Sequence, residues 1–307
     1  MARPDMREHE HLGVMLTSLP VEIILEIIPH VPFSPSQFQT LRKISSTFES
    51  AIASHEKSLV NAIRGIQYTK STIASFPGLS QSYTGLSTLH SRLDTISGLS
   101  DLWPRLTTGN ADLAWIRDRW LTIYKLGTLL LYRLQDCSAH DTRTDLLNAL
   151  PATSLAPLFF TLHSSVKVLR CHGPEPINGS YSKGDAEARV DIELAFEEML
   201  LQHGPDFFVS LLRAGRAQNC DEPGWAVWAL DREITTIEWR QLHSHTPTLI
   251  STLRRSFAAK MECRICENTS KMWEVLSGTV FDDVSDEVTV IVVKGEALKG
   301  GMRRMGF

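Results

Sequence analysis

The sequence predicts an all-α protein in which a small N-terminal helical motif precedes an irregular α-helical bundle. Apolar residues recur every three or four positions along most of the 307-residue chain, the spacing of helices with a buried face. No period of 20–50 residues recurs clearly, so repeat architectures are not supported. One segment differs, because Glu287–Lys294 is dense in β-branched residues. It indicates a short C-terminal strand, or a helix extension made of poor helix formers.

Thr17 or Ser18 can cap the first predicted helix, and Pro20 lies in its first turn, where a missing amide hydrogen costs nothing. Glu22 lies in the first turn, where a negative charge complements the helix dipole. Pro29 and Pro32 end the pattern, because proline lacks the amide hydrogen and crowds the preceding turn. The apolar face of this helix comprises Ile23, Ile24, Ile27, Ile28 and Val31.

A second helical pattern begins at Ser34-Pro35-Ser36, which is a helix start signal. Its apolar face comprises Phe38, Leu41, Ile44 and Phe48. A further helix within Ala53–Tyr68 completes a unit that spans residues 16–68. The part that carries the two apolar faces, residues 16–52, has about 40 residues and is near the lower size limit for independent stability, so we expect another protein to cover part of its apolar surface. The alternative is that these faces pack only against the rest of the chain.

This stretch resembles the F-box, a short helical motif that docks on the Skp-type adaptor of cullin–RING ubiquitin ligases. The matching pieces are Leu19-Pro20, Glu22-Ile23, Ile27, Leu41, Ile44-Ser45 and Phe48. The helix that follows is similar to the one after the motif in filamentous-fungal F-box proteins. The match covers about an eighth of the chain. It departs from the family pattern at Pro29, inside the first helix, and in the longer connection Pro32–Gln37.

The resemblance implies a non-catalytic subunit, without a cofactor, that recruits a protein target for ubiquitination. Such a subunit acts by raising the local concentration of the target beside the ligase. The residues that the resemblance assigns to adaptor binding are Leu19, Pro20, Ile23, Ile27, Leu41, Ile44 and Phe48. Two alternatives stay open: a Skp-bound scaffold that directs no degradation, and a helical metal-dependent enzyme.

The rest of the chain divides into three further parts: an N-terminal tail (1–15), a hinge (69–110) and a helical target-binding domain (111–307). The hinge is rich in Ser, Thr and Gly, and we expect one short helix in it around Leu86–Ile96. The helices predicted for the C-terminal domain are Asp112–Asp136, Leu155–Leu169, Asp185–His203, Pro205–Ala217, Pro223–His243 and Thr246–Glu267.

Three tryptophans, Trp225, Trp228 and Trp239, fall on one predicted helix of this domain. The simplest interpretation is that they form part of its core. The alternative is an aromatic groove that binds the target together with Arg232 and Arg240, because Trp and Arg are effective interface anchors.

A Cys-x-x-Cys pair, Cys263 and Cys266, follows His243 and His245, and these four side chains could complete a tetrahedral zinc shell. The cysteines, however, lie within the continuous helix predicted for Thr246–Glu267, whereas structural zinc sites place such pairs on tight turns. We therefore interpret them as small buried apolar residues and expect no metal.

Two acidic clusters also invite a catalytic interpretation. Asp282–Asp286 matches the Asp-Asp-x-x-Asp motif of terpenoid synthases, but it lies too near the end of the sequence and no second magnesium motif follows. Glu193, Glu197 and Glu198 precede His203, yet a di-iron bundle needs Glu-x-x-His. We interpret the first cluster as a solvated turn and the second as a solvated helix face.

Composition limits the remaining classes. The net charge of −4 gives no overall electrostatic footprint for nucleic acid. The longest apolar runs are too short to span a bilayer, and residues 1–15 lack the pattern of a secretory signal. Five cysteines without such a signal indicate reduced thiols, so we expect the cytoplasm or the nucleus.

Overall fold

The computed structural model describes residues 19–278, apart from 77, 109–112, 114–115, 117–118, 180–185, 217–223 and 244–246. The described residues form helices and turns without a strand, which confirms the all-α prediction. The strand predicted at Glu287–Lys294 and the acidic cluster Asp282–Asp286 lie outside the described residues. The chain divides into two compact units, residues 1–94 and 95–307.

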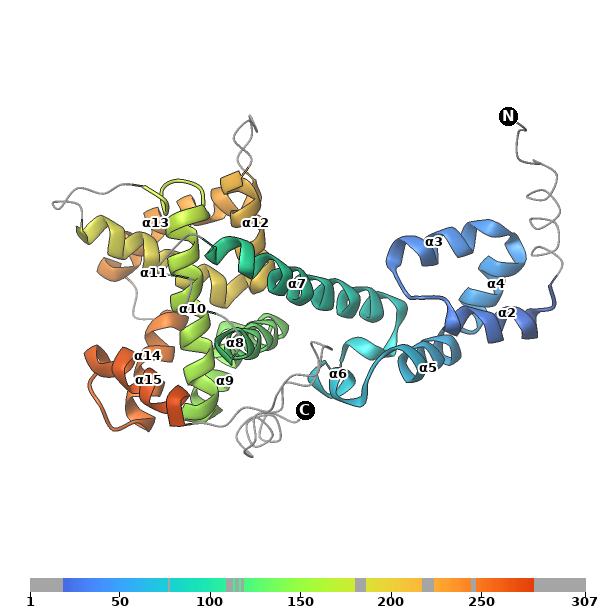
Figure 1. Ribbon diagram of the computed structural model, residues 1–307, viewed down its shortest axis with the longest axis horizontal. Helices are drawn as coiled ribbons and strands as arrows, with labels where there is room; N and C mark the ends of the chain where they lie inside the picture. The colour runs from blue at the N-terminus through green and yellow to red at the C-terminus, as the bar shows by residue number, and fades with distance from the viewer. Residues whose placement is uncertain are drawn as a thin grey trace. The chain divides into compact units, whose positions relative to one another are not determined.

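The first unit contains short helices joined by tight connections (Figure 1). They are α2 (Val21–Ile27), η1 (Ile28–His30), α3 (Pro35–Ile44), α4 (Ser46–Ser54), α5 (Glu56–Gln67), α6 (Lys70–Ser75) and η2 (Leu79–Gln81). The predicted stop at Pro29 and the start signal at Ser34-Pro35 are confirmed, whereas Thr17 and Ser18, the predicted caps of the first helix, lie outside the described residues. α2 begins directly after Pro20 and gives way to the 3-10 turn that contains Pro29. The Ser34 hydroxyl caps α3 by accepting from the Gln37 amide at 3.2 Å.

The prediction of one helical face running from Phe38 to Phe48 is wrong, because the chain breaks at Ser45. Ser45 has extended backbone angles (φ −161°, ψ 163°), and its hydroxyl accepts from the Phe48 amide at 3.3 Å. A serine that bonds to the backbone in this way competes with the helical ladder and begins a new helix. Phe48 therefore belongs to α4 and is buried.

The loop between η1 and α3 is held by one side chain of α5. The Gln67 Nε2 donates to the carbonyls of Pro29 and Val31, each at 2.7 Å, and its Oε1 accepts from the Phe33 amide at 2.8 Å. The longer connection noted in the sequence is thus fixed by three hydrogen bonds to α5. Around it, the core of this unit includes Ile24, Ile28, Phe33, Phe38, Phe48, Ile52, Leu59 and Ile63.

The prediction of a short helix around Leu86–Ile96 is also wrong, because this segment belongs to α7 (Tyr83–Thr107), a helix of 25 residues. Its hydroxyl groups do not interrupt it, because they bond back to the carbonyl four residues earlier. Examples are Ser87 to Tyr83 and Ser100 to Ile96, at 2.9 and 2.8 Å. The Ser and Thr content that suggested a linker is therefore compatible with a continuous helix.

The second unit begins with the remainder of α7, from Thr95, and is arranged around one long helix, α10 (Figure 1). Its further helices are α8 (Arg119–Asp136), α9 (His140–Ala149), α10 (Ala152–His172), α11 (Ala186–His203), α12 (Pro205–Arg216), α13 (Trp225–His243), α14 (Leu249–Lys260), η4 (Ile265–Glu267) and α15 (Asn268–Gly278). α10 packs against α8, α11, α12, α14 and α15. A helix that is apolar on most of its circumference is expected at such a central place.

The helices α8 and α10 approach each other closely where they cross. A Cβ atom at Gly127 would lie 2.0 Å from the Thr161 hydroxyl and 2.4 Å from the Pro157 carbonyl oxygen. The hydroxyls at this crossing are paired, because Thr128 and Thr161 both donate to the Tyr124 carbonyl. Only glycine permits this contact between the two backbones.

Helices α9 and α15 were not predicted, and several predicted helix boundaries are displaced, two of them by seven residues. The helix expected from Asp112 begins at Arg119, and Ile116, which precedes it, uses its carbonyl to accept from the Trp103 indole at 3.0 Å. The helix expected over Thr246–Glu267 ends at Lys260 and is followed by a turn in which Glu262 has φ +51°. Within the described part of the chain, no helix combines the length and hydropathy that crossing a membrane requires.

Candidate functional site

The candidate adaptor-binding residues differ in burial: some are exposed, some are half-buried and one is buried. Ile23 and Ile27, one turn apart on α2, are 40% and 42% exposed. Pro20 is also exposed, whereas Leu19 is half-buried. Large apolar side chains with this exposure, placed side by side, form a patch that another protein can cover.

The other candidates contribute less to this surface. Leu41 and Ile44 of α3 are half-buried, and Phe48 of α4 is buried in the core of the unit. Ile24 of α2 and Ile28, the first residue of η1, are also buried. The structure thus separates the apolar residues of α2 into an inner pair and an outer pair, a division that the sequence pattern left open.

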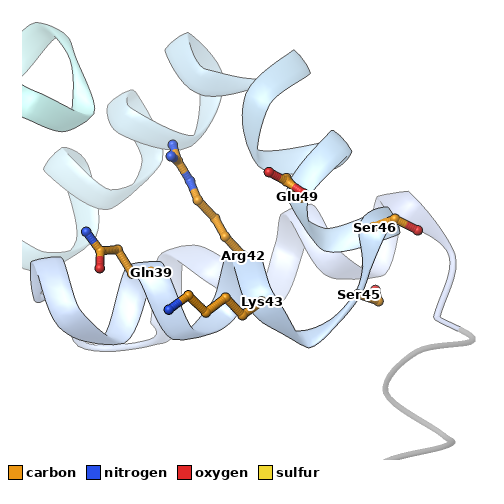
Figure 2. Close-up of a pocket in the computed structure, with 6 residues that line it drawn as sticks. All are labelled: Gln39, Arg42, Lys43, Ser45, Ser46 and Glu49. Carbon is orange, nitrogen blue, oxygen red and sulfur yellow. The ribbon is translucent and has the colours of Figure 1, made fainter.

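Two hollows lie beside this motif. One, of about 430 Å³, is lined by Gln39, Arg42, Lys43, Ser45, Ser46 and Glu49 (Figure 2). Figure 2 shows that Arg42 and Lys43 extend from α3 in different directions, while Glu49 projects from α4. The Arg42 guanidinium lies 5.5 Å from the centre of the Tyr83 ring, a cation–π contact.

The second hollow, of about 500 Å³, lies between the start of α2 and one face of α4. It is lined by Val21, Ser46, Thr47, Ser50, Ala51, Ser54 and His55. Small side chains let the backbone of a partner approach closely, so this face of α4 suits the docking of another polypeptide.

Trp225 and Trp228 of α13 do not form part of the core, so that interpretation is wrong for these two residues. Their exposed fractions are 53% and 68%. The Trp225 ring packs against the rings of His203 and Phe207, whose centroids lie 5.9 and 5.7 Å from its own. Arg232, one turn beyond Trp228, is exposed too. Trp239 and Arg240 lie on α13, but their side chains are outside the described part.

Other tryptophans fill the core instead. The Trp103 ring lies 4.1 Å from that of Tyr124, and its indole nitrogen is paired with Ile116. Trp120 and Trp273 pack edge-to-face at 5.1 Å, and both contact Phe160. No pattern within a single helix distinguishes these buried rings from the exposed ones.

The cysteine pair lies on a turn rather than inside a helix, which corrects the prediction. Cys266 is exposed in η4, and Cys263 is partly exposed, so neither is the buried apolar residue expected. Desolvation and then the nearby Glu267 raise the pKa of the Cys263 thiol. The described residues contain no group of three metal-ligating side chains, and the side chains of His243 and His245 lie outside them.

The glutamates of α11 are not a solvated face, so that prediction is also wrong. Glu198 is buried, and Glu197 is only 12% exposed. Glu193 accepts from Arg170 at 2.7 Å, and Glu197 accepts from Arg254 of α14, also at 2.7 Å. Charges are seldom buried unless they are paired, and both of these arginines belong to other helices. Neither partner could be identified from the pattern of α11.

No family model matches this chain, and searches of curated proteins and of solved structures found no match either.

Proposed function

We propose that this chain is a non-catalytic adaptor of the cytoplasm or nucleus. It docks on a Skp-type subunit of a cullin–RING ubiquitin ligase through α2–α4 and presents a protein target through its second unit. The proposal rests on the F-box resemblance. The observation that carries it is the exposure of Ile23 and Ile27 on α2, while the neighbouring Ile24 and Ile28 already fill the core.

The exposed pair can contribute measurably to binding. Burying a whole isoleucine side chain stabilises by about 1.5–3 kcal/mol, so covering the exposed two-fifths contributes about 1 kcal/mol for each residue. Together, about 2 kcal/mol corresponds to an affinity about 30-fold higher. An aspartate at either position would lose this gain and add the cost of burying a charge.

For the target, we propose the outer face of α13, where Trp225, Trp228 and Arg232 are exposed at intervals of one turn. Aromatic and arginine side chains supply most of the binding energy at many interfaces. The contacts of Trp225 with His203 and Phe207 hold its ring in place, which reduces the entropy lost on binding.

The test is a binding measurement between the full chain and a purified Skp-type adaptor. We expect Ile27→Asp and Ile23→Asp to abolish binding while circular dichroism stays unchanged. The matched control is Ile66→Asp, because Ile66 on α5 is 53% exposed but lies outside the motif, so that variant should bind normally. A folded Ile27→Asp variant that binds as tightly as wild type would refute this assignment.

A second measurement distinguishes the proposed ligase adaptor from the scaffold alternative. If the chain carries the adaptor into an assembled ligase, cullin should co-purify with wild type and be lost with Ile27→Asp. Retention of the adaptor without any cullin would favour a scaffold that directs no degradation.

A further inference from the structure

Two basic side chains in the last turn of α3 have no acidic partner. Arg42 and Lys43 are exposed, and neither forms an ion pair among the contacts of the described residues. Both line the hollow of about 430 Å³ shown in Figure 2, where Glu49 is the one acid among the described lining residues. The rest of this lining is neutral and polar: Gln39, Ser45 and Ser46. The hollow therefore carries a net positive charge.

The guanidinium of Arg42 is held in one direction by two aromatic rings. It lies 5.8 Å from the centre of the Phe38 ring and 5.5 Å from that of Tyr83, and both rings are buried in the first unit. Cation–π contacts leave the N–H donors in the plane of the guanidinium available for a carboxylate. Because the side chain is already ordered, pairing it with an acid loses less entropy than pairing a free arginine.

The basic hollow is continuous with the surface proposed for the adaptor. Ser46 lines both hollows, and the second also includes Val21, which lies in the first turn of α2 together with Ile23. A stable interface buries about 800 Å² on each partner, far more than two isoleucine side chains can supply. A partner that covers this turn of α2 and extends along α4 to Ser46 therefore also reaches the basic hollow.

The charge of the hollow decides which part of a partner can lie there. An apolar segment would remove water from two cations without replacing it, and a basic segment would add like charge. Carboxylates instead pair with the ammonium group of Lys43 and can bind the guanidinium of Arg42 with both oxygens. The volume of the hollow also exceeds that of one small anion, so it suits a stretch of polypeptide.

We propose that this hollow receives an acidic segment of the Skp-type adaptor, whose carboxylates pair with Arg42 and Lys43 while its apolar surface covers Ile23 and Ile27. The inference rests on the proposed function and adds the sign of the charge that the adaptor presents beside α3. Ion pairs at the rim of an interface act mainly by speeding association, and salt weakens them. Each cation should therefore raise the affinity by up to about 5-fold at low salt.

Association of the full chain with a purified Skp-type adaptor tests the inference, measured at about 50 mM and about 1 M salt, where charges are screened within about 3 Å. Lys43→Glu is the informative variant, because Lys43 makes no hydrogen bond or ring contact among the described residues, so the fold should survive. We expect slower association and an affinity lowered about 10-fold at low salt, because the pair is lost and repulsion is added. At high salt the difference should largely disappear.

Two further variants make this result specific. Lys57→Glu is the matched control: Lys57 is an exposed residue of α5 outside both hollows, and the variant changes the net charge equally, so it should bind like wild type. Lys43→Gln only removes the charge and should show a smaller effect of the same sign.

The outcomes separate this inference from the proposed function. If the Lys43→Glu variant associates as fast as the Lys57→Glu variant, or if wild-type association does not change with salt, the inference is overturned. The proposed function still stands in that case, provided that Ile27→Asp abolishes binding. A folded wild-type chain that does not bind the adaptor overturns both.

Discussion

Replacing Gln67 by leucine tests how the loop after α2 is held. Leucine has nearly the same size but loses all three hydrogen bonds to Pro29, Val31 and Phe33. Each bond contributes about 1 kcal/mol net, and a buried backbone group left without a partner costs about 1–3 kcal/mol. Gln67 is half-buried, so water can replace part of this loss. We expect the first unit to lose about 2–3 kcal/mol.

Hydrogen exchange measures this loss within the first unit, because core amides of α4 and α5 exchange through its opening. The amide of Phe33 should in addition lose its own protection, since its acceptor is the Gln67 side chain. Gln39→Leu is the control, an identical chemical change at an exposed position of α3, and it should alter the opening free energy by less than about 0.5 kcal/mol. The reasoning is refuted if Gln67→Leu behaves like this control and the Phe33 amide stays protected.

Three further substitutions test the packing. Gly127→Ala should lower the free energy of unfolding by about 2–3 kcal/mol, read from urea denaturation, because its methyl group would overlap the Thr161 hydroxyl and the Pro157 carbonyl; an unchanged midpoint would mean that the helices separate without cost. Trp228→Ala should change stability by less than about 0.5 kcal/mol, whereas Trp103→Ala should lose about 3–5 kcal/mol in the same assay, and equal effects would contradict the assigned burial. Ser45→Ala should cost the first unit about 1 kcal/mol by removing the cap of α4, with hydrogen exchange of the Phe48 amide as the measurement.

Local signals were predicted well because their physics is short-range. Pro20 and the Ser34-Pro35 pair fix where α2 and α3 begin, and Pro29 fixes where α2 ends, through groups within a few residues. The same reasoning failed at Ser45, where a serine inside an apolar pattern was free either to continue the helix or to cap the next one. It failed again in α7, whose hydroxyls bond to their own helix.

The candidate adaptor surface was predicted only as a set of residues. Sequence named Ile23, Ile27 and Phe48 alike, and the fold placed the isoleucines outside and the phenylalanine in the core. α2 has apolar residues on two sides. Periodicity identifies the residues that can be buried, but the position of the neighbouring helices decides which of the two sides is buried.

By itself, the sequence determined that the described part of the chain is helical, where several of its helices begin or end, and which short motif resembles a docking element. Only the tertiary structure decided that Trp228 faces water while Trp103 lies in the core, that Gly127 is a point of contact, and that Glu197 is paired with Arg254, 57 positions away. The physical reason is that propensity, capping and periodicity act over one or two turns of a helix. Burial, close approach and charge pairing depend instead on residues far apart in the chain that packing brings together.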